Sequence, residues 1–177
     1  DYEVAIADYE KRVPPNKAWE DFYAQANFRR AEILRHNDRI AEAMPNYDKA
    51  VAMRPDNLEF RFNRALANSR LERHDAVIAD LTRVIDASPR RGPFYISGLN
   101  NRGLAYMRQG KFPEAIADLD RALATEPGSP LTLVRRGIIF EGAGQRDKAI
   151  ADYRESLKIY AKMQEALDGL KRLGAAP

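Results

Sequence analysis

Small and apolar residues recur along the chain at spacings of three and four, with polar residues between them. Ala115, Leu119 and Ala122 show this pattern, which places side chains on one face of an α-helix. Proline closes several of these segments, because it cannot continue a helix. The pattern predicts an all-α chain, with helices over residues 1–13, 18–36, 39–53, 57–71, 74–87, 94–109, 112–125, 130–143, 146–160 and 163–173.

One long segment of this pattern is repeated along the chain. The stretch from Arg102 to Pro127 returns, with changes, as Arg30 to Pro55, Arg64 to Pro89 and Arg136 to Ala161. The phrase Ile-Ala-Asp begins at Ile6, Ile78, Ile116 and Ile150. Because a short helical unit leaves an apolar face open, neighbouring units must stack to cover it. The sequence therefore predicts an array of helical hairpins.

The length of the repeat alternates between a longer and a shorter unit. The equivalent small residues of successive units are Ala5, Ala43, Val77, Ala115 and Ala149. The interval from Ala5 to Val77 equals the interval from Val77 to Ala149, so a two-repeat block occurs twice. Both long units carry a Phe-Tyr pair in their extra stretch, at Phe22-Tyr23 and Phe94-Tyr95. We infer duplication of this block, and we expect a lengthened first helix or an extended loop in both long units.

These positions resemble the tetratricopeptide repeat, a helical hairpin of about 34 residues with small and aromatic residues at set places. The small residue of the first helix is Ala31, Ala65, Gly103 and Gly137. The second helix has a small residue followed four positions later by Tyr9, Tyr47, Leu81, Leu119 and Tyr153. The closing prolines are Pro55, Pro89 and Pro127. Small residues of this kind allow two antiparallel helices to approach closely.

The resemblance implies an α-solenoid of tetratricopeptide helix-turn-helix repeats in a right-handed superhelix. We expect residues 1–177 to form one array. Its expected parts are a partial repeat and linker at 1–23, repeats at 24–57, 58–95, 96–129 and 130–161, and a capping helix at 162–174.

Composition changes this picture only slightly. The 29 Lys and Arg residues are interspersed with 26 Asp and Glu residues, so we read most charges as solvated surface rather than as a nucleic-acid site. The absence of cysteine excludes disulfides, thiolate metal sites and cysteine catalysis. No apolar run approaches the roughly 18 residues of a membrane span. The compartment stays open between the cytoplasm and, if a signal peptide was removed, the periplasm.

The sequence predicts no catalytic site, no metal site and no cofactor. His36 and His74 both fall where a first helix gives way to a turn, which is typical of a solvated or capping residue. The carboxylates form no pair that stands out from surface charge, and no strand is expected to carry a glycine-rich phosphate loop. We therefore expect that the protein is not an enzyme.

Regularly spaced charges predict a structural role. Three arginines precede three aspartates by sixteen positions, which predicts salt bridges across the hairpins between Arg64 and Asp80, Arg102 and Asp118, and Arg136 and Asp152. Arg30 is expected to differ, because Asn46 stands at the position of its aspartate. We expect Arg30 to face Asn46 or to reach back to Asp8.

The family resemblance implies that first-helix residues line a groove that binds a peptide. Carried onto this sequence, the candidate peptide-binding residues are Asn63, Asn101, Arg135, Phe28, Phe62, Leu66, Arg70, Leu104 and Arg108. Further groove positions include Glu32, Arg35, Asn100, Leu131, Val134 and Glu141. Asn63 and Asn101 stand out because an amide can both donate to and accept from a peptide backbone. We expect Asn101 to be accessible, without a saturating partner inside the protein.

The chaperone-binding members of the family hold a C-terminal carboxylate with a clamp of Lys, Asn, Asn, Lys and Arg. The corresponding residues of this chain are Phe62, Leu66, Asn101, Leu131 and Arg135. Only Asn101 and Arg135 match, which argues against that particular partner.

The sequence favours an adaptor or scaffold that binds a protein or peptide segment in the groove. One alternative is a structural module that self-associates through its open N-terminal hairpin face. An RNA-binding helical repeat is less favoured, because no aromatic residues recur at regular surface positions for base stacking.

Overall fold

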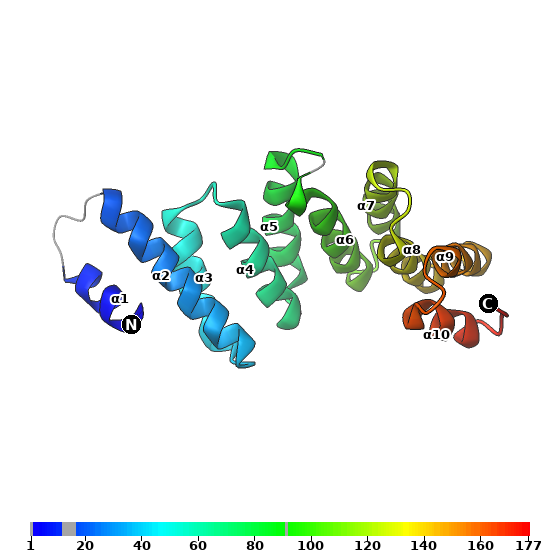
Figure 1. Ribbon diagram of the computed structural model, residues 1–177, viewed down its shortest axis with the longest axis horizontal. Coiled ribbons are helices and arrows are strands. Elements are labelled where there is room, and N and C mark those ends of the chain that lie inside the picture. Colours follow the sequence, from blue (N-terminus) through cyan, green and yellow to red (C-terminus); the bar gives the residue numbers. More distant parts are fainter. Residues whose placement is uncertain (1, 12–16, 91) are drawn as a thin grey trace. The chain divides into compact units, whose positions relative to one another are not determined.

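The structure is a computed structural model, and it describes residues 2–11, 17–90 and 92–177 (Figure 1). These residues form helices and turns, with no strand among them. The helices are α1 (Tyr2–Glu10), α2 (Lys17–His36), α3 (Ile40–Met53), α4 (Leu58–Arg70), α5 (His74–Ala87), α6 (Pro93–Arg108), α7 (Phe112–Thr125), α8 (Pro130–Gly142), α9 (Arg146–Ile159) and α10 (Gln164–Arg172). None of the described helices is long and apolar enough to cross a membrane.

The predicted helices agree with the structure to within one residue at each end, except the first. The first helix was expected to reach residue 13, but α1 ends at Glu10 and Lys11 lies in a turn. Positions 12 and 13 lie outside the described residues. Pro14 and Pro15 follow in the sequence, and proline disfavours a helix that runs into it.

The chain divides into two compact units, residues 1–87 and 88–177. Unit 1 contains α1 to α5, and unit 2 contains α6 to α10. Consecutive helices within each unit pack as hairpins, α2 with α3 and α4 with α5 in unit 1, and α6 with α7 and α8 with α9 in unit 2. In unit 2 the first helices α6, α8 and α10 also contact one another in succession. They form a row, which we call the first-helix row of unit 2.

The small residues of the repeat lie where the two helices of a hairpin meet. A Cβ added to Gly103 would come within 2.2 Å of a methyl carbon of Leu119, and one added to Gly137 would come within 2.7 Å of the Tyr153 ring. Ala31 and Ala65 are fully buried at the equivalent places of unit 1. The helices therefore approach so closely that Gly103 and Gly137 leave no room for a Cβ, whereas Ala31 and Ala65 each fit a single methyl group.

The extra stretches of the two long repeats lengthen the first helix. α2 has 20 residues and α6 has 16, whereas α4 and α8 have 13 each. In each extension, the hydroxyl of a buried tyrosine contacts a cationic side chain from the next helix. The Lys49 ammonium lies 3.5 Å from the Tyr23 hydroxyl, and Arg121 donates to the Tyr95 hydroxyl at 3.1 Å. The two extensions therefore make the same contact at equivalent positions of the duplicated block.

Candidate functional site

An arginine of the first helix binds an aspartate of the second helix in three hairpins. In each pair Nε and Nη2 donate to the two carboxylate oxygens, at 2.7 to 2.8 Å. The pairs are Arg64 with Asp80, Arg102 with Asp118, and Arg136 with Asp152. All three aspartates are buried. These arginines hold the hairpins together and are not available to a ligand.

Two of these arginines also bind the preceding hairpin. Arg64 contacts Asp48 at 3.0 Å, and Arg136 contacts Asp120 at 2.7 Å. Hydrogen bonds to Asp152 and Asp120 outweigh the opposing effect of burial and raise the pKa of Arg136. Each of these two arginines therefore joins three helices, and they occupy equivalent positions in the two copies of the duplicated block.

The expectation for Arg30 is wrong. Its guanidinium binds Glu3 of α1 at 3.1 Å, rather than Asn46 or Asp8. Asn46 offers no charge, and its amide donates to the backbone oxygen of Glu42 at 3.4 Å. A carboxylate on the neighbouring helix therefore replaces the aspartate that this hairpin lacks.

Two expected groove residues, Glu32 and Glu141, are bound inside the protein. Arg35 donates twice to Glu32, at 3.1 and 2.8 Å, and the Tyr47 hydroxyl also donates to it. Burial acts to raise the pKa of Glu32. The hydrogen bonds from Arg35 and Tyr47 together have the larger effect, so its pKa is lowered. In unit 2 the Tyr153 hydroxyl donates to Glu141 at 2.7 Å.

Arg172 of α10 completes the cluster in unit 2, since it donates two bonds of 3.0 Å to Glu141. These bonds lower the pKa of Glu141. Burial and the bond to Glu141 raise the pKa of Tyr153. Arg172 could not be predicted from the sequence, because it lies far along the chain from its partner and belongs to no periodic pattern.

Three predicted groove positions are buried, so the predictions for them are wrong. Phe28 is 1% exposed and stacks on Phe60 with ring centroids 4.6 Å apart, within the core of unit 1. Val134 belongs to the core of unit 2. Asn100 is 3% exposed and donates to the Thr132 hydroxyl at 3.0 Å. These residues lie on the side of the first helix that packs against neighbouring helices, which helical spacing alone did not distinguish.

The other candidates of unit 1 lie on α4. Asn63 is half-buried and donates its amide to the backbone oxygen of Glu59 at 2.9 Å. Phe62 and Leu66 are half-buried, and Arg70 is exposed. The candidates are thus divided between the two units, with those of unit 2 on α6 and α8.

The candidates of unit 2 are Asn101, Leu104, Arg108 and Arg135. Asn101 is half-buried, and its amide donates to the backbone oxygen of Ser97 at 2.7 Å, which uses one of its two N–H donors. Leu104 is half-buried and Arg108 is exposed. Among the candidates of this unit, Asn101, Leu104 and Arg108 share α6, and Arg135 lies on the neighbouring helix α8.

Arg135 differs from the arginines of the hairpin pairs. It is half-buried, and it has no carboxylate partner within the described part of the chain. Loss of water contact lowers its pKa. The sequence of α6 contains neither Asp nor Glu, and the one acidic residue of α8, Glu141, is bound by Arg172. Within the first-helix row of unit 2, α6 and α8 therefore have an excess of positive charge.

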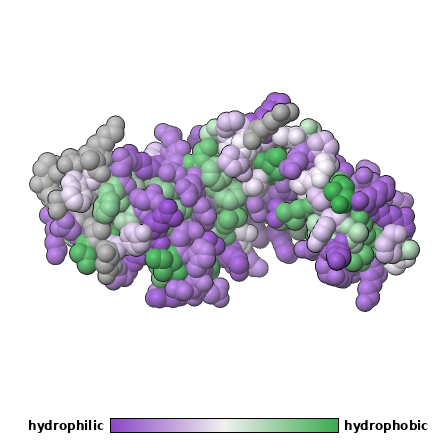
Figure 2. All heavy atoms as spheres, in the orientation of Figure 1, coloured by the Kyte–Doolittle hydropathy of each residue, from purple (hydrophilic) through white to green (hydrophobic). Residues whose placement is uncertain are grey.

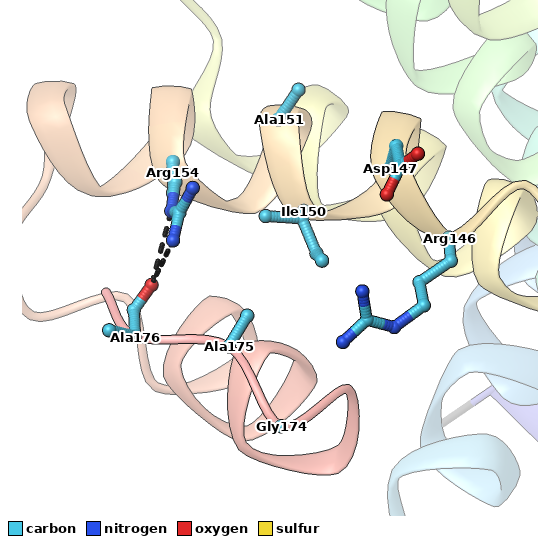
Figure 3. Close-up of a pocket in the computed structure, with 8 residues that line it drawn as sticks. All are labelled: Arg146, Asp147, Ile150, Ala151, Arg154, Gly174, Ala175 and Ala176. Carbon is cyan, nitrogen blue, oxygen red and sulfur yellow. Dashed lines mark hydrogen bonds between the residues drawn. The ribbon is translucent and has the colours of Figure 1, made fainter.

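Unit 2 also has an open pocket of about 530 Å³ between α9 and residues 174–176 (Figure 3). Arg154 donates to the backbone oxygen of Ala176 at 3.1 and 2.9 Å, and Arg146 donates to that of Leu173. The two arginines therefore hold the chain's own backbone against α9. Across the described residues, no group of three or more His, Asp or Glu side chains could hold a metal ion.

Comparison with known protein families shows which family this sequence matches. Three sequence models described as tetratricopeptide repeat match residues 39–91, 96–129 and 132–163. The chain belongs to the tetratricopeptide repeat family. Members are helical solenoids that act as protein-interaction scaffolds. No curated protein sequence matches the chain.

Solved structures show the same fold. A tetratricopeptide repeat protein from Parabacteroides merdae superposes with a TM-score of 0.82 at 19% identity, over 97% of this chain and 64% of that one. The chain thus spans less than two thirds of that protein's length. YrrB, described as having an unusual peptide-binding site, gives 0.78 at 18% identity, over 96% of this chain and 84% of that one.

A third structure, the first TPR of Spaghetti (RPAP3) bound to the HSP90 peptide SRMEEVD, covers less of this chain. Its TM-score is 0.60 at 23% identity, over 66% of this chain and 90% of that one. At such identities these likenesses establish the fold alone.

Proposed function

We propose that the protein is a scaffold that binds an acidic peptide segment on the first-helix row of unit 2. The observation that carries the proposal is Arg135, a half-buried cation without a carboxylate partner among the described residues. An ion that has lost water without gaining a counter-charge is costly for the folded protein. A ligand carboxylate at Arg135 would supply the missing charge through two parallel hydrogen bonds.

The surroundings of Arg135 fit an extended segment. Leu131, one turn before Arg135 on α8, is 46% exposed and offers an apolar contact. Asn101 retains an amide oxygen and a second N–H for a peptide backbone. Arg108 adds an exposed cation on α6. These groups would bind the backbone, an apolar side chain and acidic side chains of one segment.

Two of the similar proteins are associated with peptides, since YrrB has an unusual peptide-binding site and the first TPR of Spaghetti is bound to the peptide SRMEEVD. They support binding of a peptide in general. The acidic character of the ligand rests on the charges of α6 and α8 in this chain.

A binding experiment with two synthetic peptides tests the proposal. The probes are a fluorescein-labelled peptide of alternating Glu and Leu, and the same peptide with Gln in place of Glu. Fluorescence anisotropy should show the acidic peptide binding about tenfold more tightly at low salt, and this preference should shrink as salt is added. Arg135→Gln should weaken binding of the acidic peptide by about three- to tenfold, the loss of one hydrogen-bonded contact.

The matched control is Lys158→Gln, which removes the same charge from α9, where the side chain is 71% exposed. This variant should bind like the unchanged protein. Equal affinity for the two peptides, or equal effects of the two substitutions, would contradict the proposal.

Asn101 gives a second test of the same site. Asn101→Ala should leave the melting temperature nearly unchanged and weaken binding of the acidic peptide by about three- to tenfold. A destabilised protein with unchanged binding would make Asn101 a structural residue.

A further inference from the structure

The two units join their successive first helices in different ways. In unit 1, Phe28 of α2 stacks on Phe60 of α4 with ring centroids 4.6 Å apart. In unit 2, the same two positions of the duplicated block hold Asn100 of α6 and Thr132 of α8, and the Asn100 amide donates to the Thr132 hydroxyl at 3.0 Å. All four residues are 1 to 3% exposed, so the exchange lies below the largely hydrophilic surface of Figure 2. One copy of the block thus has an apolar contact where the other has a polar one.

The polar contact is part of a chain of hydrogen bonds that joins both helices. The Asn100 amide also donates to the backbone oxygen of Ile96 at 3.0 Å, which holds the side chain against its own helix. The Thr132 hydroxyl donates to the Ser129 hydroxyl at 3.0 Å, and Ser129 is the N-cap residue of α8. Because hydrogen bonds depend on both distance and angle, this chain fixes the spacing and the register of α6 and α8.

The polar pair allows a close approach of the helices but has a cost in stability. α6 and α8 contact one another in the first-helix row of unit 2, whereas α2 and α4, with two rings between them, make no comparable contact among the described residues. The Asn100 side-chain oxygen is buried and accepts no hydrogen bond from the described part of the chain. A buried acceptor without a partner costs stability, which an apolar pair avoids. A geometric role therefore explains this pair better than a stabilising one.

The residues of the proposed peptide site are neighbours of this pair on both helices. Asn101 follows Asn100 on α6, and Leu131 precedes Thr132 on α8. Arg135 lies three positions after Thr132, within one turn of the same helix. A segment that contacts α6 and α8 together binds most tightly when the two helices are already held at the right spacing.

We propose that Asn100 and Thr132 are positioning residues, whose hydrogen bond holds α6 and α8 at the spacing that peptide binding requires. This inference rests on the proposed function, because it concerns the same site. Both side chains are buried, so they act through Asn101, Leu131 and Arg135 rather than on the ligand itself. Without the hydrogen bond the spacing varies, the site is assembled for only part of the time, and the affinity falls in proportion.

Two variants separate positioning from stability. Asn100→Leu combined with Thr132→Val replaces both partners by apolar side chains of similar size, so the melting temperature should stay the same or rise. Fluorescence anisotropy should nevertheless show about three- to tenfold weaker binding of the acidic Glu-Leu peptide. The matched control is Thr132→Ser, which keeps the hydroxyl but loses a buried methyl group. It should melt about 2–4 °C lower and bind the peptide like the unchanged protein.

Distances measured without peptide test the positioning by itself. The chain contains no cysteine, so spin labels can be attached through Arg108→Cys on α6 and Leu131→Cys on α8, which are both exposed positions. Double electron–electron resonance should give a narrow distribution of distances in this labelled protein, and an equally narrow one when Thr132→Ser is added. The combined Asn100→Leu and Thr132→Val change should broaden the distribution.

An unchanged distribution in the apolar variant would overturn the positioning role. Peptide binding that follows the melting temperature instead of the hydroxyl would overturn it as well. If the unchanged protein shows no preference for the acidic peptide, the proposed function fails, while the label distances still decide whether Asn100 and Thr132 hold α6 against α8.

Discussion

Units 1 and 2 make many of the same contacts between helices but differ in their turns and surface charge. The triple contacts of Arg64 and Arg136 match, as do the tyrosines of the two extensions. Unit 1 has 14 Lys and Arg against 16 Asp and Glu, whereas unit 2 has 15 against 10. Most of the residues that join helices therefore match between the two units, while their net charges differ.

The largest effect on stability is expected from the buried ion pair of Arg102 and Asp118, which has no equivalent in unit 1. Unit 1 has Asn46 at the place of Asp118, and its Arg30 is partly exposed. Asp118→Asn should lower the free energy of unfolding by about 3 kcal/mol, because it removes the buried carboxylate that balances Arg102. Urea unfolding measures this loss.

Asp48→Asn is the control for this variant, because Asp48 is 60% exposed while it binds Arg64. Its cost should stay under about 1 kcal/mol, as for a surface ion pair. Similar losses in the two variants would mean that burial does not distinguish these ion pairs.

The next largest effect on stability is expected from the two glycines that pack against the Tyr153 ring. A Cβ at Gly137 or Gly169 would lie 2.7 or 2.4 Å from the Tyr153 ring, which is held between α8 and α10. Gly137→Ala should therefore destabilise unit 2 by about 2 kcal/mol, even though alanine favours a helix. At Gly103 the nearest atom is a terminal methyl carbon of Leu119, at the end of a more flexible side chain than the Tyr153 ring. Thermal unfolding should thus show a smaller loss for Gly103→Ala than for Gly137→Ala.

A smaller effect on stability is expected from the turns between helices, which differ between the two units. Asp38 and Glu72 of unit 1 have φ of 58° and 56°, and the equivalent residues of unit 2 are Gly110 and Gly144, both with φ of 72°. Glycine adopts this conformation without the steric cost that a side chain brings, so Asp38→Gly and Glu72→Gly should each raise the stability of the protein by about 0.5–1 kcal/mol. The measurement is an increase in melting temperature. A decrease in both would show that these side chains make contacts worth more than the strain.

The smallest effect is a pH dependence that comes from Glu141. Its pKa in the folded protein lies below its ordinary value of 4.5, because Arg172 and Tyr153 donate hydrogen bonds to it. The stabilisation is therefore complete above about pH 4.5 and is lost as the pH falls through the lowered pKa. Comparison of Glu141→Gln with the unchanged protein should show a stability difference at pH 7 that shrinks toward pH 3. A difference that stays constant with pH would contradict the assignment.

The regular part of the fold could be predicted from the sequence because it depends on local spacing. Ala115, Leu119 and Ala122 mark one helix face by themselves, and the structure buries all three. The ion pair of Arg102 and Asp118 could be predicted because its spacing of sixteen residues recurs along the chain. By contrast, the exposure of each first-helix residue depends on how neighbouring hairpins stack.

The candidate site shows where this dependence limits prediction. Phe28 and Phe62 were both expected in the groove, yet Phe28 is buried against Phe60 while Phe62 is half-buried. Arg135 and Arg136 are adjacent and chemically identical. Arg136 finds two aspartates on neighbouring helices and Arg135 finds none among the described residues, a difference that only packing decides.

The most direct test of the account is a titration of the ¹⁵N-labelled protein with the acidic Glu-Leu peptide, followed by NMR. We predict that shifts of backbone amide signals concentrate in α6, α8 and α10, with the largest changes around Asn101 and Arg135. Shifts concentrated in α7 and α9, or no shifts at peptide concentrations that saturate the anisotropy signal, would contradict binding on the first-helix row of unit 2.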